Sequence, residues 1–207
     1  MPRRTKEEAQ ETRSHLLDTA ARVFREKGVS RTSLAEIAQQ AGVTRGAIYW
    51  HFENKAALFT ALCDRATLPL EALLANMADP DQPDPLGLLR RANAQALAMV
   101  EQDADCRQVF EILTLKCEYV DELAPSVQRR QECRQGVREV FRQVLENARR
   151  RGQVRADLDC GLAASALLAY IDGLIHDWSL EPGAYSLAAQ AEPMLELFFS
   201  GLTGRRG

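Results

Sequence analysis

Apolar residues recur at intervals of three and four along almost the whole chain, and this periodicity restricts the fold more than any other feature. Runs in which Val, Ile or Thr alternate with polar residues, as in half-buried strands, are nearly absent. We therefore predict an all-α protein of about nine helices.

Capping residues and glycines set the expected ends of these helices. The first helix is expected from near Thr5 to Gly28, followed by two short helices, at 34–41 and 45–50. Asn54 caps a longer helix that starts at Lys55, and the prolines of DPDQPDP then form a loop. Further helices are expected at about 86–101, 105–119, 125–151, 159–178 and 186–202.

The two short helices form a recognisable unit. Ser33 and Glu36 match a capping box, Gly42 lies in the turn, and Thr44 caps the second helix. Two short helices joined by a short turn that contains Gly are typical of a helix-turn-helix. We predict a three-helix DNA-binding domain at 1–54, and a helical ligand-binding and dimerisation domain at 55–207.

The second helix of such a unit enters the major groove with its first residues at the base edges. Arg45 suits a bidentate contact to guanine, and Gly46 lets the backbone approach a base closely. Hydroxyl groups and free amides at helix starts attract phosphate. The expected DNA contacts are Arg3, Arg4, Thr32, Ser33, Thr44, Arg45, Gly46, Tyr49, Trp50, His51 and Lys55.

Other roles for these residues remain open. Tyr49 and His51 belong to types that are often half-buried and serve packing. Trp50 either lies beside the groove or packs across the helix turn. Arg45 is alternatively a solvated surface residue.

The run GVTRGAIYWHF, with its flanking Lys and first helix, resembles the TetR family of repressors. The stretches RRTKEEAQETR, EILTLKCE and AYIDGLIHDW resemble the AcrR/TtgR-like branch, whose members repress operons for multidrug efflux pumps. The resemblance implies a dimer that reads a pseudo-palindromic operator and an effector site in the C-terminal domain. It also places Trp50 beside the groove and the effector near Asp172.

The C-terminal helices offer the apolar lining of a pocket for drug-like molecules. The expected lining is Leu89, Ala92, Ala96, Phe110, Leu113, Thr114, Val137, Phe141, Leu168, Ile171 and Asp172. Asp172 lies in the most apolar helix, where a carboxylate is costly unless it is paired. It either meets a cationic or phenolic ligand or pairs with an arginine. The last two helices are apolar beyond the needs of one core, so we expect a homodimer through them.

Charge is unevenly distributed. Residues 1–62 carry ten Lys/Arg and seven Asp/Glu, whereas the net charge of the whole chain is −3. A basic end on an acidic body fits contact with nucleic acid at that end. No apolar segment is long enough for a membrane span and no signal peptide is recognisable, so we expect a cytoplasmic protein without membrane contact.

The sequence offers nothing for metal, cofactor or catalytic chemistry. Its five cysteines form no CxxC pair, and HExxH, GxSxG and P-loop motifs are absent. We therefore expect no metal, no cofactor and no enzyme; a helical adaptor is the structural alternative. The expected function is repression of an efflux operon, relieved when a small hydrophobic molecule shifts the helix after Asn54. The alternative is a TetR-type repressor that responds to cysteine oxidation or controls other genes.

Overall fold

The computed structural model describes residues 6–118 and 121–204, and every regular element in these ranges is helical. The all-α prediction is confirmed. The elements are α1 (Lys6–Lys27), α2 (Leu34–Gln40), α3 (Arg45–His51), α4 (Lys55–Ala72), α5 (Pro85–Gln102), α6 (Ala104–Leu115), the 3-10 helix η1 (Asp121–Leu123), α7 (Ala124–Arg150), α8 (Cys160–Leu180) and α9 (Leu187–Thr203).

Side chains cap the starts of the short helices. Ser33 accepts from the amide of Glu36 at 3.2 Å, and Thr44 accepts from the amide of Ala47 at the same distance. Asn54 caps α4 through the amide of Ala57 at 2.8 Å. These local hydrogen bonds satisfy amides that a helix leaves without a partner, which is why these starts were predictable.

The sixth helix is shorter than expected. It ends at Leu115 rather than near Tyr119, which lies outside the described residues. The carbonyl of Lys116 instead accepts a hydrogen bond of 3.1 Å from the amide of Val29, in the turn after α1. A contact with a distant part of the chain therefore replaces the last helical turn.

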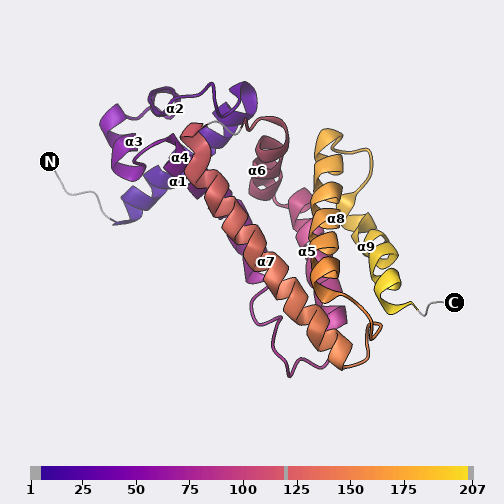
Figure 1. The fold of residues 1–207 in the computed structure, drawn as a ribbon. Coiled ribbons are helices and arrows are strands. Elements are labelled where there is room, and N and C mark those ends of the chain that lie inside the picture. Colours follow the sequence, from indigo (N-terminus) through magenta and orange to yellow (C-terminus); the bar gives the residue numbers. More distant parts are fainter. Residues whose placement is uncertain (1–5, 119–120, 205–207) are drawn as a thin grey trace.

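Figure 1 shows the long α7 running diagonally from the end formed by α1–α3 to the opposite end of the molecule. The pair α8 and α9 lies on the side away from α3, and α5 contacts α9 there. No helix in the described ranges is long and apolar enough to cross a lipid bilayer.

The buried apolar residues form two clusters. One is built from α5, α7, α8 and α9 and the segments between them. The other contains α1–α4 as far as Ala66, together with Cys106, Val109 and Ile112 of α6 and Leu123 of η1. The expected boundary at 54/55 falls inside this second cluster, because the buried side of α4 packs with α1–α3. We call the second cluster the N-terminal core.

Candidate DNA-reading surface and ligand cavity

Helix α3 is anchored by its inner side. Ile48 is fully buried, Phe52 is buried at the helix end, and Val43 packs against the N-terminal core from the preceding turn. Gly42 in that turn has φ +66°, a conformation that glycine adopts without strain. These contacts leave the opposite side of α3 facing away from the protein.

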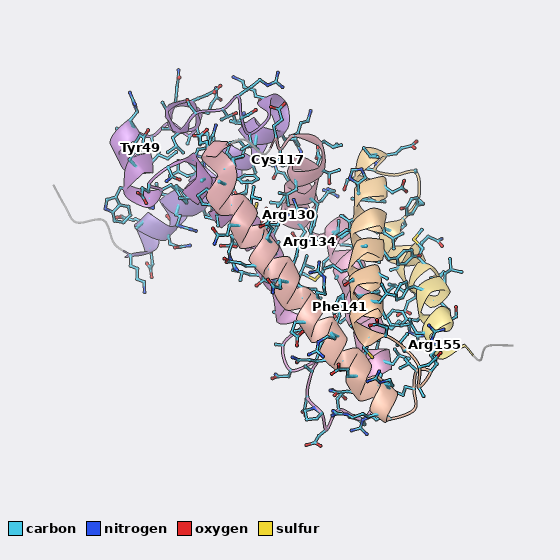
Figure 2. The ribbon with its side chains drawn as sticks, viewed as in Figure 1. Tyr49, Cys117, Arg130, Arg134, Phe141 and Arg155 are labelled. Atoms are coloured by element: carbon cyan, nitrogen blue, oxygen red, sulfur yellow. The ribbon has the colours of Figure 1, made fainter. Side chains whose placement is uncertain are left out.

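The outward side carries most of the expected base contacts. Thr44, Arg45 and Gly46 are exposed, Tyr49 is 49% exposed and Trp50 is 73% exposed. Figure 2 shows Tyr49 at the outer edge of the molecule, away from α7. An indole that exposed is not explained by packing across the helix turn. The sequence left that role open for Trp50, and the structure does not support it.

His51 differs from its neighbours because it is only half-exposed. Its ring meets the Trp50 ring edge-on, with centroids 4.6 Å apart, and lies 6.2 Å from the Phe52 ring. The imidazole therefore contacts the core side as well as the exposed side, and both expected roles fit its position.

Gly46 faces open space. A Cβ built on this residue would meet only the Thr44 hydroxyl oxygen, at 3.9 Å, and the backbone is helical. The fold therefore accepts a side chain at this position. Any requirement for glycine at position 46 therefore comes from a binding partner and not from the fold.

Two expected phosphate contacts do not fit the geometry. Thr32 is buried, and its hydroxyl donates to the carbonyl of Gly28 at 2.9 Å. Lys55 is only 6% exposed, and its ammonium donates to the carbonyls of Ser30 at 3.1 Å and Thr32 at 3.0 Å. Ser33 remains exposed at the start of α2, while Arg3 and Arg4 lie outside the described residues.

The Lys55 ammonium also pairs with Glu122 of η1 at 2.9 Å. Nearby, Ser30 donates to Glu118 at 3.1 Å, and the amide of Val29 donates to the carbonyl of Lys116. These contacts tie the turn after α1 to the segment between α6 and α7. Sequence could not reveal them, because about 65 to 90 residues separate the partners; a buried lysine needs such partners to be tolerated.

An apolar cavity of about 190 Å³ lies among α4, α5, α6, α7 and α8. Nine of the eleven expected lining residues surround it: Ala92, Ala96, Phe110, Leu113, Val137, Phe141, Leu168, Ile171 and Asp172. Leu89 is instead fully buried in the cluster built from α5, α7, α8 and α9, and Thr114 does not line the cavity. Leu89 and Thr114 were assigned from apolar periodicity and position, which do not fix which residues border a void.

Sequence reasoning missed the α4 wall. Phe59, Cys63, Thr67 and Leu70 line the cavity, and their spacing of three and four places them along one side of α4; Leu74, just after the helix, continues this wall. That spacing was the available signal. The same spacing also fits a helix that only joins two domains, so it does not by itself predict a cavity wall.

Charged pairs edge the cavity. Asp172 forms an ion pair with Arg134 across α7 and α8, so the arginine partner considered from sequence is present. Asp64 lies 3.7 Å from Arg129, and the Cys133 thiol donates to Glu71 at 3.1 Å. Figure 2 shows Arg130, Arg134 and Phe141 following one another along α7.

The cysteines are poorly placed for oxidation chemistry. Burial raises the pKa of the Cys63 thiol to about 12, and it raises the pKa of Cys106 and of Cys133 to about 11. Burial also raises the pKa of Cys117 and of Cys160. Since the thiolate is the reactive form, nothing in these thiols favours an oxidation sensor.

Comparison with known proteins gives matches along nearly the whole chain. A family model described as "Bacterial regulatory proteins, tetR family" matches residues 16–62, and one described as "MAATS-type transcriptional repressor, C-terminal region" matches 84–203. The HTH-type transcriptional regulator TtgR of Pseudomonas putida is 44% identical over 200 residues, covering 95% of this chain and 93% of TtgR.

Two solved structures are similar in fold and sequence. NalD, described as the secondary repressor of the MexAB-OprM multidrug efflux pump in Pseudomonas aeruginosa, superposes with a TM-score of 0.87 and 36% identity, covering 96% of this chain and 98% of NalD. SmeT of Stenotrophomonas maltophilia, in complex with triclosan, gives a TM-score of 0.82 and 30% identity, covering 95% and 93%.

Proposed function

Because this chain belongs to the TetR family of transcriptional regulators, we propose that it represses an efflux-pump operon until a small hydrophobic molecule fills the cavity. NalD and SmeT support the gene target, since both are described as repressors of multidrug efflux pumps. The triclosan bound to SmeT supports the class of effector. A regulator of this kind works in the cytoplasm, where the DNA is.

The exposed side of α3 is the proposed reading surface. Arg45 would meet guanine, and Gly46 would bring the backbone close to a base edge. Tyr49, Trp50 and the half-exposed His51 would border the groove, and Ser33 with Arg3 and Arg4 would contact phosphate. Thr44 caps the helix and directs its start toward the DNA.

The proposed homodimer forms through α8 and α9. One side of α8 exposes Leu162, Ala166, Ala169, Gly173 and Leu180, and α9 exposes Pro193, Leu197 and Gly201. Leu162 is 69% and Leu197 is 76% exposed. No part of the chain that the structure describes covers these apolar and small residues, and a second copy would bury them in a four-helix seam. Two α3 helices would then be spaced for half-sites about 34–36 Å apart, or a multiple of this.

Helix α6 carries the proposal, because its two sides belong to different sites. Cys106, Val109 and Ile112 pack in the N-terminal core, while Phe110 lines the cavity and packs against the other cluster. Leu113 lines the cavity and also contacts the edge of the N-terminal core. A ligand that displaces the cavity side must move the side that supports α1–α4. Coupling between such sites typically amounts to about 1–3 kcal/mol, which is about 5- to 150-fold in operator affinity.

The proposal is tested by fluorescence anisotropy with labelled promoter DNA from the gene itself and from an adjacent pump operon. We expect binding that weakens steeply with salt, as counterion release requires, and that weakens further when triclosan is added. Triclosan that binds the protein but leaves operator affinity unchanged would contradict the mechanism. A flat salt response would contradict the phosphate contacts.

A cavity-filling variant sharpens this test. Ala96→Leu places a larger side chain on the cavity wall, whereas Ala98→Leu is a matched change on the same helix outside the lining. We expect Ala96→Leu to bind DNA but to resist release by triclosan. The Ala98→Leu protein should respond as the wild type does.

A further inference from the structure

A second depression adjoins the ligand cavity. It is a groove of about 840 Å³ between α1, α4 and the first turns of α7, lined by polar side chains and a few apolar ones. Three residues line both the groove and the cavity: Thr60, Asp64 and Arg129. Only side chains from α4 and the start of α7 therefore stand between the two spaces at this point.

Two polar contacts lie at this boundary. The hydroxyl oxygens of Thr60 and Ser126 lie 2.9 Å apart, and Ser126 donates its single proton to the carbonyl of Ala56 at 3.2 Å. Thr60 must then be the donor to Ser126. The second contact is the ion pair of Asp64 and Arg129, which is long at 3.7 Å and more than one third exposed on both sides. Such exposed pairs contribute little to stability.

The start of α7 is also less secured than other helix starts. Side chains cap α2, α3, α4, α5, α6, α8 and α9, but the residue before α7, Leu123, provides no side-chain hydrogen bond. The first amides of α7 therefore lack the side-chain acceptor that the other helices have. Its first turn is instead held by the buried Leu123 and by the hydrogen bonds of Ser126 with Thr60 and Ala56.

We propose that this groove is the entry route of the effector and that the first turn of α7 is its door. The inference rests on the proposed function, since it concerns access to the same cavity. The groove presents Arg13, Arg65 and Arg129 beside Glu53 and Asp64, charges of both signs, so neither anions nor cations gain from it as a class. Uncharged aromatic molecules with one or two hydrogen-bonding groups are the class that this route and the apolar cavity admit.

An opened door is made by combining Thr60→Val and Asp64→Asn, which removes both contacts with little change in volume. Binding of the uncharged fluorophore N-phenyl-1-naphthylamine is followed by stopped flow. We expect association and dissociation rates to rise together by about tenfold, as for a gate that limits both directions. The ratio of the two rate constants, which is the dissociation constant, should change far less than either rate constant does.

Asp18→Asn is the matched control. Asp18 pairs with Arg65 at 2.6 Å between α1 and α4, but it lines neither the groove nor the cavity. This variant should leave both rates as in the wild type. An equal acceleration in the control would show that loosening the α1–α4 surface, rather than opening the door, is responsible.

A closed door is tested by combining Thr60→Cys and Ser126→Cys, because the two hydroxyl oxygens lie 2.9 Å apart and sulfur atoms in their place are candidates for a disulfide. We expect the oxidised form to load the fluorophore at least about a hundredfold more slowly, and reduction to restore the rate. The two single-cysteine variants, treated with the same oxidant, control for the native cysteines.

Wild-type rates in both the opened and the crosslinked proteins would overturn the entry route while leaving effector binding intact. Failure of the wild type to bind either the fluorophore or triclosan would instead overturn the proposed effector function, and the entry route with it. The two failures are therefore distinguishable.

Discussion

At the scale of single residues, the two sides of α3 have different tasks: the inner side holds the helix in the fold, and the outer side is free for DNA binding. Ile48 and Phe52 hold the helix, whereas Gly46 faces open space and Trp50 is 73% exposed although its ring contacts His51. Residues that the fold does not require are the ones whose replacement should affect DNA binding alone.

Gly46→Ala tests this separation. The added methyl group meets open space, and alanine favours a helix over glycine by up to about 1 kcal/mol, so the melting temperature should stay or rise. Operator affinity should fall by about tenfold or more, the size of one lost base contact. Gly136→Ala is the control, since its Cβ also meets nothing within 4 Å but it lies in α7. Equal operator affinity in both variants would contradict the close approach at Gly46.

Lys55→Met distinguishes an internal contact from a DNA contact. The change leaves the carbonyls of Ser30 and Thr32 unpaired, and we expect it to cost about 2–3 kcal/mol in the free energy of unfolding. Urea unfolding measures this cost. If Lys55 instead bound phosphate, stability would be unchanged and the slope of log affinity against log salt would fall by about 1.

The helix caps and Lys55 show what can and cannot be predicted from the sequence at the scale of single residues. The caps at Ser33, Thr44 and Asn54 depend on amides three residues away, so a local pattern predicts them. The burial of Lys55 depends on Glu122, which folding brings from 67 positions along the chain. The sequence shows that a lysine stands at the start of α4, but it does not show which residues contact that lysine.

At the scale of elements, α6 matters most because it contributes to both the N-terminal core and the cavity. The expected coupling element was the helix after Asn54, and α4 does border both spaces. The apolar spacing of α6 predicted a helix, but it did not show that its two sides pack against different partners. Periodicity gives the buried side of a helix and not the identity of what covers it.

Two adjacent residues of α6 test this division. Ile112→Ala removes a fully buried side chain from the N-terminal core and should lower the free energy of unfolding by about 2–4 kcal/mol. Leu113→Ala enlarges the cavity and should change triclosan affinity, measured by calorimetry, with a smaller loss of stability because Leu113 is only partly buried at the edge of the N-terminal core. A similar loss of stability in both variants, with no change in triclosan affinity, would contradict the two-sided role.

At the scale of the whole molecule, the exposed surface of α8 and α9 determines whether a single chain or a dimer is the functional unit. A contiguous patch of exposed apolar side chains marks a surface that has a partner, and α8 and α9 together present such a patch. A single α3 can read only one half of a pseudo-palindromic operator. A variant that no longer dimerises should therefore also lose operator affinity.

Leu162→Glu combined with Leu197→Glu places two carboxylates in the proposed seam. We expect a folded monomer by analytical ultracentrifugation, because both side chains are exposed within one chain, and a loss of operator binding of at least about a hundredfold. Leu115→Glu is the control, an exposed leucine on α6 outside the seam. A dimer that persists in the double variant would place the interface elsewhere.

The shared N-terminal core also limits how this chain can be recombined with others. A hybrid regulator that takes residues 1–54 from one parent would seat α1–α3 on a foreign α6, with different side chains at positions 106, 109 and 112. Such a hybrid inherits a mismatched core and an altered response, even when both parents share the fold. The portable unit is α1–α4 together with α6 and η1, and working chimaeric sensors will be those whose crossovers keep these segments from a single parent.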